Sequence, residues 1–101
     1  MNQREISINF INKLNDVNFN EYYRFFTKDS NAYLISLNQE VNIEEVINYL
    51  KKEIILPLEV KRILESKMFV KIETSSINQE INFYFEIKNR RIKRLEVEIV
   101  K

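Results

Sequence analysis

The sequence predicts an α+β domain in which a strongly curved antiparallel sheet of about five strands is covered on one side by three helices from the N-terminal half. Two observations support this. Apolar residues recur at helical spacing before Pro57, whereas after Pro57 they alternate with polar residues, which is the period of half-buried strands. A length of 101 residues indicates a single domain over 1–101, large enough to bury its own core.

Three stripes of apolar residues predict the helices. The first stripe consists of Ile6, Phe10, Ile11 and Leu14. The second is aromatic and consists of Phe19, Tyr22, Tyr23 and Phe26. The third consists of Ile43, Val46, Ile47, Leu50 and Ile54. Asn42 and Glu45 are spaced as the two members of a capping box at the start of this third helix, and Pro57 stops it.

The strands are expected between turn signals. Residues 28–31 form a turn cluster, Ala32 to Leu37 form a short strand, and Asn38 to Glu40 form a second break. Residues 58–67 favour a strand, although a short helical turn also fits their spacing.

A long hairpin closes the chain. Residues 75–79 connect two strands, and Asn89–Arg90 form a tight turn between the last two. The apolar phase slips between Ile92 and Leu95, which indicates a bulge in the last strand.

Composition excludes several kinds of chemistry. The chain has no Cys and no His, so Ser-His-Asp and Cys-His catalytic sets are excluded, and the usual zinc ligands are absent. It has no Gly, so the glycine-rich loops that cradle phosphates are excluded as well. We therefore expect no cofactor and no metal site. Without Gly, turns that need a positive φ fall to Asn, Asp or another residue at some steric cost.

Charge and hydropathy point to a cytoplasmic protein. The net charge is +1 with acidic and basic residues interspersed, so bulk charge gives no reason to expect a nucleic acid or a membrane as partner. The N-terminus lacks a secretory signal pattern, and no apolar run approaches the length that spans a bilayer.

Three segments resemble the nuclear transport factor 2-like superfamily, which is also described as SnoaL-like or ketosteroid-isomerase-like. Residues 25–33, Phe-Phe-Thr-Lys-Asp-Ser-Asn-Ala-Tyr, resemble its junction between second helix and first strand. Residues 41–50 resemble the following helix, without the glycine that usually introduces it. Residues 83–95 resemble the closing hairpin. The three segments are fold markers, and none is a catalytic signature.

This resemblance implies a sheet that curls into a cone, whose interior commonly binds an apolar small molecule. Enzymes of the family place an Asp or His on the first strand, just past the position that matches Tyr33. Here that stretch is Leu34-Ile35-Ser36, so the base is missing at the matching place. Because proton abstraction needs a base within hydrogen-bond reach, this departure weighs against an enzyme.

Two groups of residues are candidate contacts. Aromatic residues that could line a pocket in the cone, or simply fill it, are Tyr22, Tyr23, Phe26, Tyr33, Phe69, Phe83 and Phe85. Basic residues that could contact an anion or a partner, or simply be solvated, are Lys88, Arg90, Arg91, Lys93 and Arg94. The carboxylates to examine for a role as base are Asp29, Glu73 and Glu86, although a turn or a solvated strand face explains them more simply.

The leading hypothesis is a non-catalytic binding domain that takes either a small apolar ligand in the cone or a protein partner on the sheet face. A homodimer through the outer sheet face, with Tyr84 and Val100 in the contact, is expected. Two alternatives stay open. One is a small SnoaL-like isomerase, cyclase or lyase with a displaced acid, and the other is a small host- or phage-derived protein-interaction factor.

Overall fold

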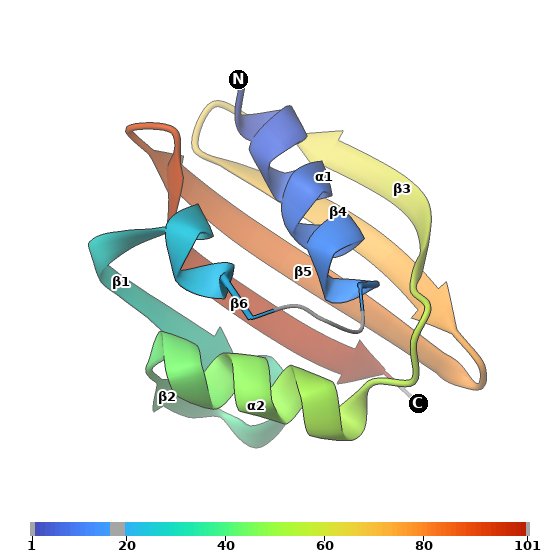
Figure 1. Ribbon diagram of the computed structural model, residues 1–101. Coiled ribbons are helices and arrows are strands. Elements are labelled where there is room, and N and C mark those ends of the chain that lie inside the picture. Colours follow the sequence, from blue (N-terminus) through green and yellow to red (C-terminus); the bar gives the residue numbers. More distant parts are fainter. Residues whose placement is uncertain (1, 17–19, 101) are drawn as a thin grey trace.

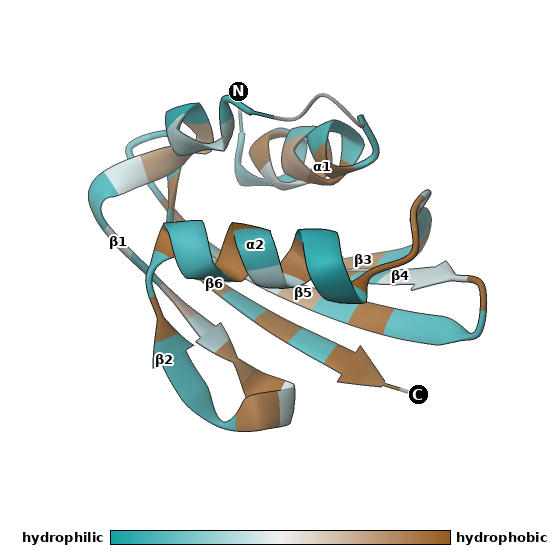
Figure 2. Cartoon of the chain, turned by 60° about the horizontal axis from the view of Figure 1, so that its bottom comes forward, coloured by the Kyte–Doolittle hydropathy of each residue, from teal (hydrophilic) through white to brown (hydrophobic). Residues whose placement is uncertain are grey.

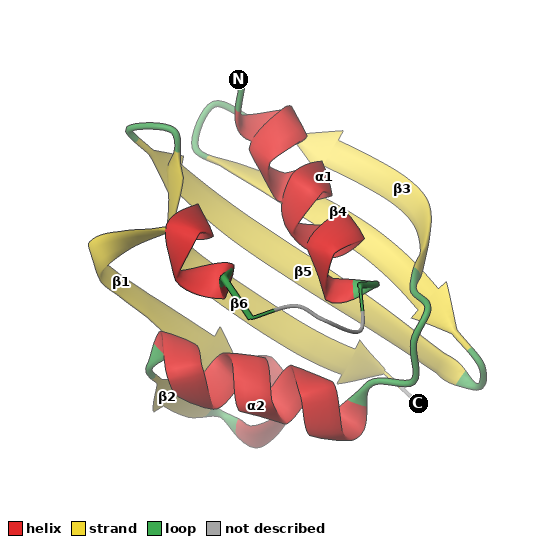
Figure 3. Cartoon of the chain, viewed as in Figure 1, coloured by secondary structure: helices red, strands yellow, loops and turns green. Residues whose placement is uncertain are grey.

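The computed structural model describes residues 2–16 and 20–100 (Figure 1). The two α-helices are α1 (Gln3–Leu14) and α2 (Ile43–Glu53), and the two 3₁₀ turns are η1 (Tyr22–Phe25) and η2 (Ile35–Leu37). The strands are β1 (Phe26–Leu34), β2 (Gln39–Val41), β3 (Glu59–Glu65), β4 (Phe69–Ser76), β5 (Gln79–Lys88) and β6 (Arg91–Val100). Figure 3 shows the helical segments, which all precede β3 in the chain, and the sheet that they cover.

The six strands form one curved sheet in the order β2-β1-β6-β5-β4-β3. Both α-helices lie on the same side of this sheet, and no α-helix of the described chain covers the other side (Figure 2). The α+β class is thus confirmed, but the finer prediction needs correction. The described residues form six strands rather than about five and two α-helices rather than three, and the sheet is mixed because β1 pairs with β6 in parallel.

Local sequence signals place α1 and α2 where they were predicted. The Asn2 side chain accepts a hydrogen bond of 2.9 Å from the Glu5 backbone N–H at the start of α1. At the start of α2, the Asn42 side chain accepts from the Glu45 backbone N–H at 2.8 Å, and the Glu45 carboxylate accepts from the Asn42 N–H at 3.1 Å. This reciprocal pair is the predicted capping box, which satisfies two backbone donors left unpaired by the first turn.

The predicted second helix is wrong. Only Tyr22–Phe25 form a 3₁₀ turn, and Phe26 already begins β1, where it is buried and pairs with Ile92 of β6. Phe19, the first residue of the predicted aromatic stripe, lies outside the described residues. Aromatic residues favour strands more than helices, so strand pairing with a distant segment outweighs their helix-like spacing.

The first strand also begins earlier than predicted. Residues 28–31 lie within β1 rather than in a turn, although the pairing with β6 shifts register between Phe26 and Asn31, so the strand bulges at this place. The predicted strand end at Leu37 is replaced by the turn η2. Asn38 follows this turn with φ 52°, which agrees with the predicted break in regular structure. The next residues, Gln39–Val41, pair back onto β1 as the unpredicted strand β2.

The C-terminal half follows the predicted pattern. Residues 59–65 are a strand, which settles the ambiguity at 58–67, and β4 and β5 are joined by a tight turn after Ser76. Asn89 and Arg90 have φ of 53° and 64° in the turn between β5 and β6. The predicted bulge is confirmed, because Ile87 pairs with Ile92 and Glu86 pairs with Arg94, which leaves Lys93 as the extra residue in β6.

The core lies between α1, α2 and the concave face of the sheet. The ring of Phe10 is fully buried and packs edge-on against three other rings, with centroid distances of 5.8 Å to Phe25, 5.6 Å to Phe26 and 5.7 Å to Phe85. Phe83 stacks on Phe85 at 6.1 Å. Edge-on aromatic pairs add to the free energy gained by burial, so this cluster joins α1 to β1 and β5.

Phe10→Ala should lower the free energy of unfolding by about 3–5 kcal/mol, because it removes a fully buried ring and leaves a cavity. Ile77→Ala is the matched control, since Ile77 is 70% exposed, and it should change stability by less than about 0.5 kcal/mol. Urea denaturation of both variants checks this, and equal losses would show that Phe10 is not central to the core.

Candidate functional site

The concave interior contains almost no polar chemistry. Among the described residues the buried polar side chains are Ser7 and Thr74. The Ser7 hydroxyl donates to the Gln3 carbonyl at 2.9 Å, and the Thr74 hydroxyl donates to the Ile81 carbonyl at 2.8 Å. Both groups are satisfied by backbone, and no carboxylate of residues 2–16 and 20–100 is buried beside them. A proton acceptor for catalysis is therefore missing from the described interior.

The seven aromatic pocket candidates do not come together. Phe26, Phe83 and Phe85 are buried on the concave face as part of the core. Tyr33 and Phe69 lie on the opposite face, because each alternates with a buried neighbour along its strand. Tyr22 and Tyr23 lie on η1, where their rings contact edge-on at 6.2 Å. These seven residues therefore do not line one cavity. A role of any of them in binding stays a prediction.

The face of the sheet opposite the helices, called the outer face below, carries ordered charges. Side chains alternate between the two faces along each strand. The residues that lie on the outer face are therefore Tyr33, Phe69, Lys71, Glu73, Asn82, Tyr84, Glu86, Arg94, Glu96 and Glu98. On β6, Arg94 donates to Glu40 of β2 at 2.6 Å and to Glu96 at 2.8 Å. The bond to Glu40 raises the pKa of Arg94 and lowers that of Glu40, so both stay charged.

A second charge network lies at the other end of the outer face. Glu73 on β4 accepts from Arg62 at 3.0 Å and from Lys71 at 3.1 Å, and its pKa is lowered first by the bond to Arg62. The Lys71 ammonium also lies 5.4 Å from the centre of the Tyr84 ring. The guanidinium of Arg94 lies 5.7 Å from the Tyr33 ring in the same way. Both aromatic rings are therefore held by a neighbouring cation.

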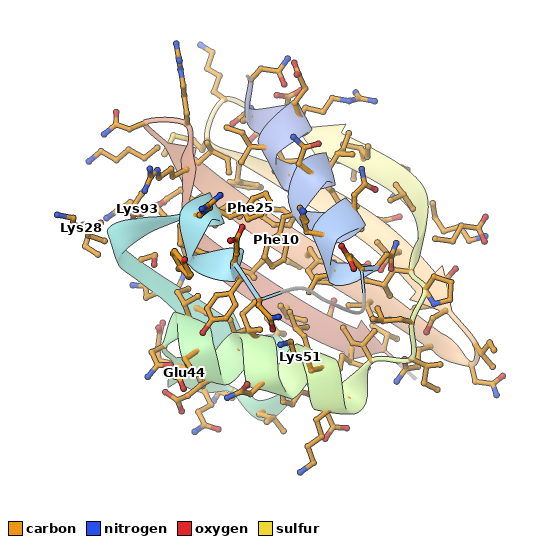
Figure 4. All side chains as sticks on the ribbon, in the orientation of Figure 1. Phe10, Phe25, Lys28, Glu44, Lys51 and Lys93 are labelled. Atoms are coloured by element: carbon orange, nitrogen blue, oxygen red, sulfur yellow. The ribbon has the colours of Figure 1, made fainter. Side chains whose placement is uncertain are left out.

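The five basic hairpin residues are likewise divided between places. Lys88 and Arg91 pair across the base of the turn and are exposed, and Arg90 is at its tip. Lys93 forms an ion pair of 2.8 Å with Asp29 where β1 bends, and Figure 4 shows Lys93 at this bend together with Lys28. Arg94 belongs to the outer face. A single basic patch made of all five is not formed.

The three carboxylates examined as bases lie outside the concave interior. Asp29 is exposed, and hydrogen bonds from Lys93 and Thr27 lower its pKa to about 2. Glu73 and Glu86 are on the outer face. A carboxylate whose pKa is lowered is a weaker proton acceptor, so Asp29 and Glu73 are poorly suited to act as a general base near neutral pH.

Within residues 2–16 and 20–100, no three acidic side chains come close enough together to hold a metal ion. No helix within this part of the chain has the length and apolar character needed to cross a bilayer.

No protein-family model matches the sequence, and no curated protein matches it. Solved structures do match its fold. A nuclear transport factor 2-like protein of unknown function from Cytophaga hutchinsonii superposes with a TM-score of 0.74 at 16% identity, over 99% of this chain and 91% of that one. A de novo designed protein with a curved β-sheet reaches 0.80 at 16% identity, over 96% and 84%. The chain has the nuclear transport factor 2-like fold.

A protein from Shewanella putrefaciens, provisionally described as a SnoaL-like polyketide cyclase, shares the nuclear transport factor 2-like fold. Its TM-score is 0.74 at 11% identity, over 96% of this chain and 79% of that one. Identities this low establish the fold alone. The stretch where the resemblance expects a base is Leu34-Ile35-Ser36, none of which carries a carboxylate or an imidazole. Leu34 is buried on the concave face.

The outer-face networks were not found by sequence reasoning. The sequence pattern shows Arg94 only as part of a basic run, and it predicts a break between elements at its partner Glu40. The two residues are 54 positions apart, and β2 and β6 both flank β1 in the sheet. Only the alternation of Arg94 and Glu96 along the last strand indicated that these two share a face.

The side-chain carboxyl of Asp29 should titrate with a pKa of about 2, measured by ¹³C NMR. Because this lies below the ordinary value of 3.8, the stabilisation from the ion pair is present above pH 3.8 and is lost as pH falls through 2. Lys93→Met should return the pKa toward 3.8. Lys28→Met removes an exposed lysine of the same bend and should leave it unchanged, so equal shifts in both variants would exclude a specific pair.

Proposed function

We propose that this chain is a non-catalytic binding domain that acts through protein contact on the outer face of its sheet, with a second copy of the chain as the partner. One observation carries the proposal. The helix-covered face is packed with aromatic rings, whereas the outer face is bare of helices and carries aromatic side chains held beside ordered ion pairs. A sheet with one uncovered face commonly gains stability by covering it.

A non-catalytic role is supported because the described interior lacks the base that the resemblance implies for enzymes. The stretch where the resemblance expects a base, Leu34-Ile35-Ser36, has no carboxylate, and the described interior buries Ser7 and Thr74 but no carboxylate. Its polar groups are already hydrogen-bonded to backbone carbonyls. Neighbours described as cyclases or isomerases therefore support the fold of this chain but supply no reaction for it.

The size of the outer face suits a dimer. Six strands at a spacing of about 4.8 Å, with the longest rising roughly 30 Å, present an area of roughly 700 Å². Stable protein interfaces bury about 800 Å² per partner. Exposed apolar side chains at the β3–β4 end add contact area, since Leu64, Met68 and Phe69 are 43%, 68% and 49% exposed.

The outer face has a basic side and an acidic side, so it is complementary in charge to the same face of a second copy. At the β3–β4 side two cations, Arg62 and Lys71, share one carboxylate. At the β2–β6 side one cation, Arg94, is shared by the carboxylates of Glu40 and Glu96. A two-fold axis running along the strands, between β5 and β6, would place the basic side of one copy against the acidic side of the other. This arrangement favours a second copy over an unrelated partner.

Sedimentation equilibrium of the purified chain tests the proposal. We expect a dimer that Tyr84→Arg weakens by at least about tenfold. Tyr84 lies on β5 next to the proposed axis, so the substitution brings two like charges, one from each copy, close together. The dimer should also weaken with added salt, since opposite charges meet across it. Ile77→Arg, which changes an exposed turn residue away from the face, is the control and should dimerise normally.

A monomeric wild-type chain at high micromolar concentration would overturn the proposal. A dimer that Tyr84→Arg leaves intact would do the same, because the contact would then lie elsewhere. Circular dichroism of Tyr84→Arg should match the wild type, which separates loss of the dimer from loss of folding. Binding of a small apolar ligand inside the cone is the weaker proposal, because Phe10, Phe83 and Phe85 occupy that space with mutual ring contacts.

A further inference from the structure

A groove of about 500 Å³ lies between α1 and η1, on the helix side of the molecule and away from the outer face. Its volume is in the range of small-molecule sites. Eight residues line it: Ile6, Asn9, Asn12, Lys13, Asp16, Arg24, Phe25 and Arg90. They come from α1 and the residues after it, from η1 and from the tip of the β5–β6 hairpin. Two neighbouring segments, α1 and η1, therefore meet the distant tip of the β5–β6 hairpin around one space.

The groove combines apolar walls with positive charge. The Phe25 ring is held by its edge-on contact with Phe10, and Figure 4 shows both residues between α1 and η1. Three cations face one carboxylate in the lining, although the whole chain carries a net charge of only +1. Arg24 pairs with Glu21 at 3.3 Å, whereas Lys13 and Arg90 form no ion pair within the described chain. Two cations thus remain available for an anion.

Arg90 occupies a backbone position that is unfavourable for arginine. The turn Asn89–Arg90 has positive φ at both residues, which is the geometry of the two-residue hairpin turn that prefers Asn followed by Gly. Four described residues have a positive φ, and three of them are Asn, which tolerates this region. Arg90 is the exception. Arg90 thus lines the groove in a backbone conformation that is unfavourable for arginine, and the turn itself does not require arginine there.

We propose that this groove binds a small organic anion with an apolar body, such as a medium-chain carboxylate or phosphomonoester. Arg90 and Lys13 hold the anionic head by charge-assisted hydrogen bonds, and Ile6 and Phe25 contact the apolar body. Arg90 supplies two parallel N–H groups that match a carboxylate or phosphate. The site is independent of the outer face, so it does not depend on whether the chain forms a dimer.

Isothermal titration with decanoate, kept below the concentration at which it forms micelles, tests the site. We expect saturable one-to-one binding that decanol does not reproduce, because decanol lacks the anionic head. Arg90→Gly should weaken decanoate binding by at least about tenfold. The same variant should raise the unfolding temperature by roughly 2–5 °C, since it places Gly where the turn prefers it. Decyl phosphate, titrated in parallel, shows which anionic head the groove favours.

Arg91→Gln is the matched control. It removes one positive charge from the same hairpin, but Arg91 does not line the groove, so binding of decanoate should stay within about twofold of the wild type. Amide shifts in ¹H–¹⁵N spectra should concentrate at Ile6, Phe25 and Arg90. The proposal is overturned if wild-type protein does not bind either amphiphile saturably, if decanol binds as well as decanoate, or if Arg91→Gln and Arg90→Gly weaken binding equally.

Discussion

The ring of Phe10 joins α1 to three other parts of the chain through edge-on contacts with Phe25, Phe26 and Phe85. Phe25 ends η1, Phe26 begins β1, and Phe85 lies in the middle of the sheet. The place of β1 beside β6 and the wall of the groove at Phe25 therefore depend on one buried side chain. Dense packing makes such a junction rigid, because a change of ring volume must be accommodated by several elements at once.

The two faces of the sheet follow from the same alternation but have opposite character. Inward residues such as Phe83 and Val97 are almost fully buried, and they exclude water and charge. Outward residues on the same strands, such as Tyr84 and Glu96, form cation–π contacts and ion pairs instead. The interior is consequently filled by the chain's own apolar side chains, which differs from the ligand-binding cone that the resemblance implies.

The absence of Gly shapes the turns. Asn78 and Asn89 supply positive φ in hairpin turns and Asn38 does so after η2, since a short polar side chain tolerates this region. Arg90 has no such advantage, and it is one of the residues that line the groove. At the tip of the β5–β6 hairpin, the residue with the unfavourable positive φ is thus also a cation of the groove. The same hairpin carries the bulge at Lys93, which separates the neighbouring cations: Lys93 contacts Asp29, whereas Arg94 contacts the outer face.

The sequence by itself determined what depends on local pattern: α1, α2 with its capping box, the alternating strands after Pro57, and the turn and bulge of the last hairpin. It also indicated the fold through three short resemblances. Only the tertiary structure decided the start of β1 at Phe26, the strand β2 and the pairing of Arg94 with Glu40. The start of β1 and the pairing of Arg94 with Glu40 need contacts between residues more than 50 positions apart, and neither helical nor strand periodicity carries information about such partners. The strand β2 pairs with residues only five to nine positions before it, but its three residues are too few to show a period.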